Sequence, residues 1–248
     1  MVQPEQLYQG VTLMLVVFIV DLLERRRPGF SVDRRSELGL NIAAILVVIV
    51  AGELSKRLVL AGCTALDLDA ALSVDRLRSL PGPAKILFAI VLVDCGLYWV
   101  HRAMHTPFLW RTHSFHHSIG EIWWLSGART SVAHLFLFAV PQIVIVYFLL
   151  HLSVAEAGAA FSFGVVVNIW IHANIWVDLG PLEKVLITPN YHRIHHGAKG
   201  LTNKNLGFVL TVWDRMFGTY VGPDATGKDF ALFAVPTGKR LVRMLIGL

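Results

Sequence analysis

The sequence predicts an all-α integral membrane protein, with about four to five transmembrane helices and a histidine-rich helical cap on the cytoplasmic side. The composition is too apolar for an ordinary soluble protein, because 55% of the residues are hydrophobic, 16% are charged and the mean hydropathy is +0.59. The apolar residues also gather in runs long enough to cross a bilayer. In addition, eight of the eleven histidines fall in three short motifs.

Five apolar runs each approach the ~20 residues that a membrane-spanning helix needs. The second run is the least regular, because it contains Asn41 and ends at Glu53. Pro141 is expected to kink the fourth run, and a tight hairpin at residues 151–153 should join it to the fifth. The runs are Leu7–Leu23, Leu38–Leu54, Ile86–Val100, Val132–Leu152 and Val154–Ile171.

The basic residues lie mostly on one side of these spans. Seventeen of the 22 Lys and Arg residues fall in the segments after the first, third and fifth runs, and five lie between residues 55 and 85. Since cytoplasmic loops carry the excess of Lys and Arg, the larger group and all three histidine motifs are predicted to be cytoplasmic. Glu24 and three arginines follow the first run, which therefore reads as a retained anchor and not as a cleaved signal.

The chain is predicted to form one membrane-embedded domain over residues 1–248, because no linker or repeat divides it. Cys63 and Cys95 are far apart and too few for a disulfide framework or a cysteine metal site. The pI near 9.4 is explained by the cytoplasmic basic residues, so no nucleic-acid partner is expected.

The three histidine motifs have spacings that place side chains on one helix face. HRAMH carries histidines at i and i+4, whereas HSFHH and HRIHH carry them at i, i+3 and i+4. A further histidine stands at the end of the fifth run, twenty residues before the last motif. The nine candidate metal ligands are His101, His105, His113, His116, His117, His172, His192, His195 and His196.

Nine imidazoles exceed the needs of one metal ion but suit two ions with four or five ligands each. Neighbouring histidines on a helix diverge by roughly 100°, so His116 and His117 could serve different ions. Such a set suits iron, although the spacing alone leaves zinc, manganese and copper open. A single i,i+4 histidine pair is more often surface decoration, and His134 and His151 are expected to lie at an interfacial or opposite-side helix end.

Two residues in the third run are candidates for positioning the ligands. Asp94 lies two turns before His101, and an acidic residue inside an apolar span is costly unless it has a role. It could accept a hydrogen bond from the non-ligating nitrogen of a histidine. Tyr98 lies between them, and Asp178 is a weaker candidate. The arginines near the motifs, Arg129 among them, read as anchors to lipid phosphates or partners of nearby carboxylates.

Four stretches around these residues carry a resemblance to a known family. They are DCGLYWVHRAMH from Asp94, TPFLWRTHSFHHS, HANIWVDLGPLEKVLITPNYHRIHHG and NLGFVLTVWDRMFGTY. Together they resemble the fatty acid hydroxylase/sterol desaturase superfamily of membrane di-iron, histidine-box oxygenases. The resemblance covers residues 94–220, about half of the chain, and the combined pattern is specific.

The resemblance implies O2-dependent hydroxylation or desaturation of a lipid, either fatty acyl, sterol or another terpenoid. It implies two iron ions held by the nine histidines, O2 as co-substrate, and no catalytic side chain beyond the ligands. The substrate would come from the bilayer. Electrons would come from a separate cytochrome b5-, ferredoxin- or reductase-like protein, and a basic cytoplasmic face suits an acidic donor.

Some features depart from the family pattern. The stretch GARTSVAHLF after the second motif lacks the His-Pro pair of many members, and Trp176 stands where some have another histidine. The ligand set is therefore predicted to hold nine histidines and not ten. Two alternatives stay open: a desaturase on the same scaffold, and a non-catalytic membrane metal-binding protein. A transporter is disfavoured because its ligands should lie near mid-membrane.

Overall fold

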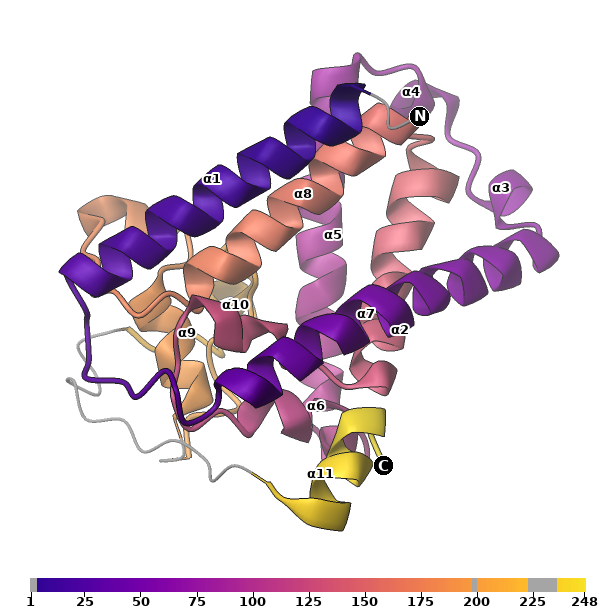
Figure 1. Cartoon of the computed structure of the whole chain (residues 1–248). Coiled ribbons are helices and arrows are strands. Elements are labelled where there is room, and N and C mark those ends of the chain that lie inside the picture. The colour runs from indigo at the N-terminus through magenta and orange to yellow at the C-terminus, as the bar shows by residue number, and fades with distance from the viewer. Residues whose placement is uncertain (1–3, 198–199, 223–235) are drawn as a thin grey trace.

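The computed structural model of the chain is built from helices, and it describes residues 4–197, 200–222 and 236–248 (Figure 1). No strand occurs among these residues, apart from one isolated bridge between Leu186 and Leu210. Five of the helices hold segments that are long and apolar enough to cross a membrane. The elements that contain these segments are α1 (Pro4–Arg26), α2 (Leu38–Ala65), α5 (Gly82–Met104), α7 (Val132–Ile143) continued by η2 (Val144–Leu149), and α8 (Val154–Ile171).

The prediction of an all-α protein with five apolar spans is confirmed, but three of the helices, α1, α2 and α5, extend beyond the predicted runs. Helix α2 continues past Glu53 to Ala65. Glu53 and Arg57, one turn apart, pair at 2.7 Å with both side chains exposed, so these charges do not interrupt the helix. Helix α5 begins at Gly82 with Pro83 in its first turn, where the absent N–H of proline costs nothing.

Pro141 distorts the fourth span as expected. The α-helical hydrogen bonding of α7 ends at Ile143, and the chain continues as the π-helix η2. His151, at φ 48°, then turns the chain, and Ser153 starts α8 by accepting a hydrogen bond from the backbone N–H of Glu156. The predicted tight connection between the fourth and fifth spans is thus present.

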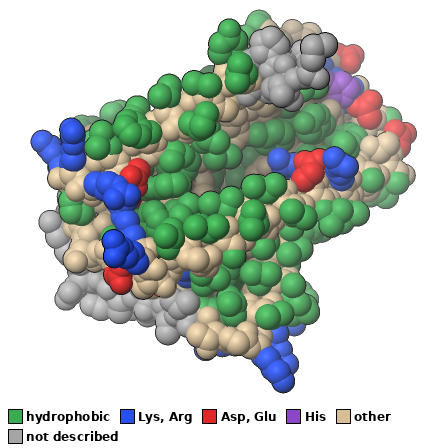
Figure 2. Space-filling view, in the orientation of Figure 1, with side chains coloured by type: hydrophobic (Ala, Val, Ile, Leu, Met, Phe, Trp, Pro, Cys, Tyr) green, Lys and Arg blue, Asp and Glu red, His purple; other side chains and the backbone are tan. Residues whose placement is uncertain are grey.

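The spans pack as a bundle with two arms (Figure 1). Helix α1 lies along α8, α2 lies along α7, and α5 packs against both α7 and α8. Helices α5 and α7 approach closely at Gly96, where an added Cβ would lie 2.6 Å from the Cβ of Pro141. Many large apolar side chains on α1 and α2 are exposed, and Figure 2 shows them covering the outer surface, as a lipid-facing surface requires.

The short helices form the two ends of the bundle. Two connect α2 to α5, whereas most of the others gather at the opposite end, where α5 terminates (Figure 1). They are α3 (Leu68–Ala71), α4 (Asp75–Arg78), α6 (Trp110–His117), η1 (Trp124–Ala128), η3 (Gly180–Lys184), α9 (Pro189–His196), α10 (Val212–Met216) and α11 (Gly238–Ile246). Both cysteines are free, in line with the expectation that no disulfide forms.

Candidate metal centre

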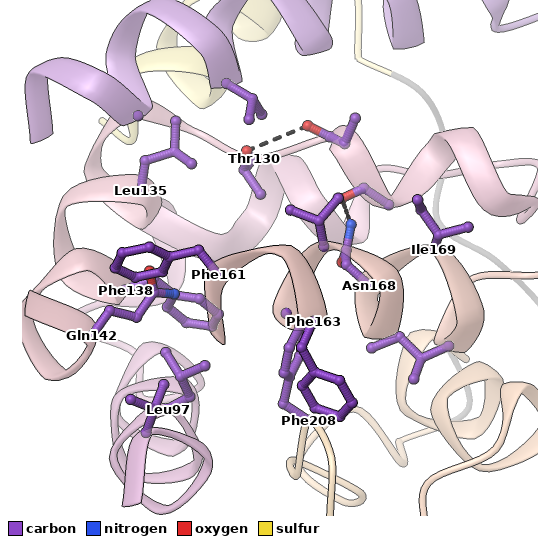
Figure 3. Close-up of a pocket in the computed structure, with 18 of the residues that line it drawn as sticks. Leu97, Thr130, Leu135, Phe138, Gln142, Phe161, Phe163, Asn168, Ile169 and Phe208 are labelled. Carbon is purple, nitrogen blue, oxygen red and sulfur yellow. Dashed lines mark hydrogen bonds between the residues drawn. The ribbon is translucent and has the colours of Figure 1, made fainter. Parts of the chain in front are cut away.

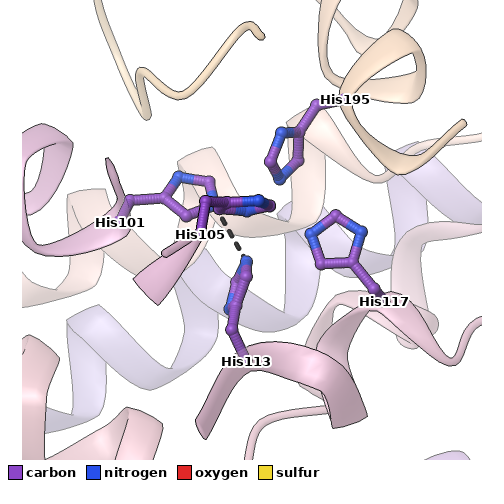
Figure 4. Close-up of side chains that lie close together, drawn as sticks. All are labelled: His101, His105, His113, His117 and His195. Carbon is purple, nitrogen blue, oxygen red and sulfur yellow. Dashed lines mark hydrogen bonds between the residues drawn. The ribbon is translucent and has the colours of Figure 1, made fainter. Parts of the chain in front are cut away.

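All nine histidines singled out in the sequence meet at the end of the bundle where α5 terminates. They form two groups, and within each group the nitrogen atoms that can bind a metal lie within 4.8 Å of one another. The five-histidine cluster, shown in Figure 4, and the four-histidine cluster are almost wholly buried. The five-histidine cluster comprises His101, His105, His113, His117 and His195, and the four-histidine cluster comprises His116, His172, His192 and His196.

Helix geometry divides the second and third motifs between the two clusters, whereas both histidines of HRAMH belong to the five-histidine cluster. In α6, His113 and His117 are one turn apart and face the five-histidine cluster, whereas His116 points to the other. Helix α9 makes the converse division. His192 and His196 face the four-histidine cluster and His195 faces the five-histidine cluster. Pro189 stands at the first position of α9 after the N-cap residue Thr188, where its missing N–H group costs nothing.

Backbone carbonyl groups fix the orientation of four of the imidazole rings. In each ring Nδ1 lies 2.7 to 2.9 Å from a carbonyl oxygen, which can only accept, so Nδ1 must carry the proton. The Nε2 atom is then an unprotonated lone pair that faces the cluster. The pairs are His101 with Leu206, His116 with Arg129, His172 with Asn168 and His195 with Lys204.

The converging nitrogen atoms fit a cation. The Nε2 atoms of His101 and His113 are 2.9 Å apart, and those of His172 and His192 are 3.2 Å apart. The buried Nε2 of His195 has no hydrogen-bond partner among the described residues. A buried lone pair without a donor is costly, whereas a metal ion accepts several such lone pairs at once. The donor set therefore suits one transition-metal ion in each cluster.

Burial keeps the ligands in the form that binds metal. Loss of hydration lowers the pKa of His172 to about 4 and that of His105 to about 2. The pKa values of the α6 and α9 histidines are also lowered well below the usual range, with burial as the main cause and neighbouring histidines adding to it. The imidazoles outside the spans are therefore neutral at neutral pH.

The predicted role of Asp94 is wrong in its detail. Its carboxylate accepts hydrogen bonds from the backbone N–H groups of residues 208–210, at 2.8 to 3.3 Å, and from Nε1 of Trp213 at 2.8 Å, and not from a histidine ring. The Nδ1 of His101 instead reaches Leu206. The carboxylate of Asp94 thus holds the backbone of residues 208–210, which directly follows Leu206 and Gly207. Asp94 supports the partner of His101 and not the ring itself.

Tyr98 also lacks a direct contact with the ligands among the described residues. Its hydroxyl group lies 2.9 Å from Oγ1 of Thr219 and accepts a hydrogen bond from Arg102 at 2.9 Å. Its ring stacks on Phe217 at 5.5 Å. Tyr98 therefore holds residues 217–219 against α5. Asp178, the weaker candidate, is exposed and accepts a hydrogen bond from the N–H of Gly180.

Of the two roles expected for Arg129, the structure agrees with the partner of a nearby carboxylate and not with the anchor at lipid phosphates, because the residue is fully buried. Its guanidinium group pairs with Glu37 at 2.6 Å and also donates to the side-chain oxygen of Asn41 and the carbonyl of Ser118, both at 2.8 Å. The carbonyl oxygen of Arg129 accepts from His116, so this ion pair supports the four-histidine cluster. The only feature of the sequence that pointed to Glu37 is its position directly before the second apolar run.

His134 was expected at an interfacial or opposite-side helix end, but it is buried beside the five-histidine cluster. Its Nδ1 lies 3.2 Å from Nδ1 of His113, and its ring packs on Phe138 at 4.3 Å. His151 is exposed and bonds to Asp69, near η2. The sequence did carry a signal that His134 faces inward, because it stands four residues before Phe138 and therefore on the same face of an apolar helix.

An apolar cavity of about 560 Å³ leads to both histidine clusters. Helices α2, α5, α7 and α8 supply most of its walls, and Figure 3 shows aromatic and aliphatic side chains projecting into it. The histidines that reach the cavity come from both clusters and include His101, His113, His116, His172 and His192. A molecule in this cavity therefore meets both candidate metal sites.

Comparison with known proteins agrees with this arrangement. The family model described as fatty acid hydroxylase matches residues 86–219, more than half of the chain. No solved structure matches. Among the curated relatives, alkylglycerol monooxygenase of Danio rerio is 39% identical over 141 residues, which cover 53% of this chain and 29% of that protein.

Two further relatives are named for other lipid reactions. Ornithine lipid hydroxylase of Rhizobium tropici is 34% identical over 58% of this chain and 44% of its own length. A protein described as a probable Delta(7)-sterol 5(6)-desaturase of Neurospora crassa is 29% identical over 57% of this chain and 39% of its own. The matches thus span between about a third and a half of the relatives' lengths.

Proposed function

Because the chain belongs to the fatty acid hydroxylase family, we propose that it is a multi-pass membrane oxidoreductase that uses O2 to hydroxylate a lipid C–H bond. The single observation that carries this proposal is the meeting of the apolar cavity with both histidine clusters. An apolar cavity in a bundle of apolar helices suits a lipid, and redox-active metals are needed to oxidise an unactivated C–H bond.

Two iron ions are the proposed cofactors, one in each histidine cluster. When bound, they supply the redox chemistry that activates O2. Imidazole suits iron as a ligand, and the absence of cysteine or carboxylate from both clusters disfavours sites that require those groups. The nine neutral imidazoles hold the ions, and the carbonyl groups bonded to Nδ1 aim four of the rings.

The chain's own residues bind and orient the substrate. The cavity walls remove water from the alkyl chain, which favours binding by roughly 25 cal/mol for each Å² of apolar surface buried. They also exclude water from the reacting carbon. Because histidines of both clusters line the cavity, a chain bound there would reach both candidate metal sites.

The reaction requires electrons from outside the chain. Hydroxylation converts a C–H bond, O2, two electrons and two protons into an alcohol and water, whereas desaturation consumes the same reagents and yields a C=C bond and two waters. We infer a separate electron-donor protein of the cytochrome b5, ferredoxin or reductase type. The excess of Lys and Arg supports a cytoplasmic location for the site and docking of an acidic partner.

Lipid mass spectrometry of cells with and without the protein tests this function. Hydroxylation predicts a lipid that gains one oxygen atom, and desaturation predicts one that loses two hydrogen atoms. The variant His195→Ala should abolish the change, and His151→Ala, which removes an exposed histidine outside both clusters, should preserve it. Persistence of the product in His195→Ala contradicts a catalytic role for the clusters.

Metal analysis distinguishes an enzyme from a non-catalytic metal-binding protein. Protein purified from iron-replete cells is expected to hold about two iron ions per chain and to consume O2 when a reductant is added. A colourless protein that holds only zinc and consumes no O2 contradicts the proposed function.

A further inference from the structure

The cavity has an apolar body but two polar side chains at the end away from the histidines. Lys56 on α2 and Gln142 on α7 both line it, beside Phe161 on α8. Figure 3 shows Gln142 next to Phe161 and Phe138, across the cavity from Asn168. The Nζ atom of Lys56 lies 4.9 Å above the ring of Phe161, so Lys56 belongs to the same end.

Lys56 does not follow the usual behaviour of lysine near a lipid surface. Such side chains extend toward the polar interface, as the neighbouring Arg57 does, with 76% of its side chain exposed. Lys56 is half-buried and its ammonium group faces the cavity wall. It has no hydrogen bond or close ion pair with any residue that the structure describes. Glu53, three residues earlier on α2, attracts it at longer range but pairs directly with Arg57, so the ring of Phe161 is the only close contact of the ammonium group recorded among the described residues.

Gln142 is a second polar group that lacks a partner. It lies in one of the most apolar spans, where an amide needs hydrogen bonds to offset its transfer from water. The described part of the chain offers it none. By contrast, the polar groups nearer the histidines are satisfied: Asn168 donates to the carbonyl of Gly127 at 3.1 Å, and Thr130 donates to that of Ala128 at 3.3 Å.

The spacing of residues along α7 gives the distance between the histidine end of the cavity and its polar end. His134, Phe138 and Gln142 follow at intervals of four, so they lie on one face of the helix and all line the cavity. Eight residues separate His134 from Gln142, which corresponds to about 12 Å of helix. With bonds of about 1.5 Å and angles near 111°, an extended alkyl chain covers this distance in about ten bonds.

From these observations we propose that the cavity selects a single-chain amphiphile with an anionic head group. Its carboxylate or phosphate is held by Lys56 and Gln142, and its alkyl chain runs toward the histidines. The cavity volume lies in the range of single small-molecule sites. The inference deepens the proposed function, on which it rests for the fate of the chain: oxidation then falls about ten bonds from the head group.

Binding measurements on the full chain in nanodiscs of zwitterionic phospholipid test this inference without turnover. Tritiated palmitate is the probe, and the competitors are unlabelled palmitate, palmitoyl lysophosphatidate and uncharged hexadecanol. The two anions are expected to compete about tenfold better than hexadecanol, because a charge-assisted hydrogen bond contributes more than a neutral one. If only palmitate competes, the site recognises a carboxylate. If both anions compete, the site accepts a carboxylate or a phosphate.

Variants on one helix supply matched controls. Lys56→Met should abolish the preference for anions, Lys56→Arg should retain it, and Arg57→Met, which removes a charge one position away, should also retain it. Gln142→Leu should weaken palmitate binding about fivefold. The inference is overturned if hexadecanol competes as well as palmitate, if Lys56→Met keeps the preference, or if Arg57→Met loses it equally. Equal competition by two-chain phosphatidate overturns the single-chain assignment.

The outcomes separate this inference from the proposed function. If the protein oxidises lipid in cells but shows no preference for anions in the binding assay, only the head-group assignment is contradicted. A preference for anions in a protein that oxidises no lipid contradicts only the oxygenase assignment.

Discussion

The ring of His101 and the backbone of Leu206 are joined by a 2.7 Å hydrogen bond, in which Nδ1 donates to the carbonyl oxygen. Two carboxylates hold the backbone around that carbonyl. Asp214 accepts from the N–H groups of Leu206 and Gly207, and Asp94 accepts from those of residues 208–210. The orientation of one candidate ligand therefore depends on two acidic residues whose recorded hydrogen bonds go to other groups.

This relationship predicts the effect of Asp94→Asn. An amide has one acceptor oxygen where the carboxylate has two, so at least one N–H group of residues 208–210 loses its partner, at a cost of about 1–3 kcal/mol. Displacement of Leu206 should also lower metal affinity about tenfold or more. Thermal unfolding and metal analysis of the purified protein measure both effects. Asp178→Asn, at an exposed position, is the control, and equal behaviour of the two variants contradicts the prediction.

The buried ion pair between Glu37 and Arg129 predicts a large loss of stability in Glu37→Gln. The substitution leaves the guanidinium group, which is fully buried, without its counter-charge, and breaking such pairs costs about 3–5 kcal/mol. The free energy of unfolding in mixed detergent micelles measures this loss. Glu53→Gln breaks the exposed pair with Arg57 and should cause no measurable change. A small effect of Glu37→Gln shows that water or another group replaces the carboxylate.

Close packing at Gly127 predicts a selective effect on the four-histidine cluster. An added Cβ would lie 2.6 Å from Nδ1 of His172 and 2.9 Å from Nδ2 of Asn168, so Gly127→Ala must displace the His172 ring. Metal content should fall from about two ions toward one per chain, with loss of activity. Gly62→Ala on α2 is the control, because nothing lies within 4 Å of its added Cβ. Full metal content in Gly127→Ala would show that the ring shifts without losing its ligand position.

The burial of neutral histidines predicts that acid destabilises the metal-depleted protein. Histidines in the unfolded chain bind protons near pH 6.5, whereas burial lowers the pKa of His172 to about 4 in the folded chain. Between these values the unfolded chain binds more protons, so the free energy of unfolding decreases as the pH falls. Chemical unfolding of the chelated protein from about pH 7.5 to about pH 5 measures the slope. A flat profile contradicts the assignment of neutral, buried rings.

Sequence pattern predicted much of this architecture, because the relevant signals are local. Apolar runs identified the five spans, and helix periodicity indicated that the neighbours His116 and His117 could serve different ions, which agrees with their division between the two clusters. The expectation that all three histidines of HSFHH share one face does not hold, because His116 belongs to the other cluster. Pattern was less reliable for polar residues that act at a distance. It left two roles open for Arg129, placed His134 at a helix end away from the site and paired Asp94 with the wrong group, since each of their partners comes from another part of the chain.

By itself the sequence determined that the chain is an α-helical membrane protein with nine histidines available to two metal ions, because helix periodicity and hydropathy depend on neighbouring residues. The division of those histidines into groups of five and four was decided only by tertiary packing, which brings α5, α6, α8 and α9 together. The same packing aims the rings through carbonyls of other segments and brings Lys56 and Gln142 to one cavity. These relationships join residues distant in the sequence, and no local pattern encodes them.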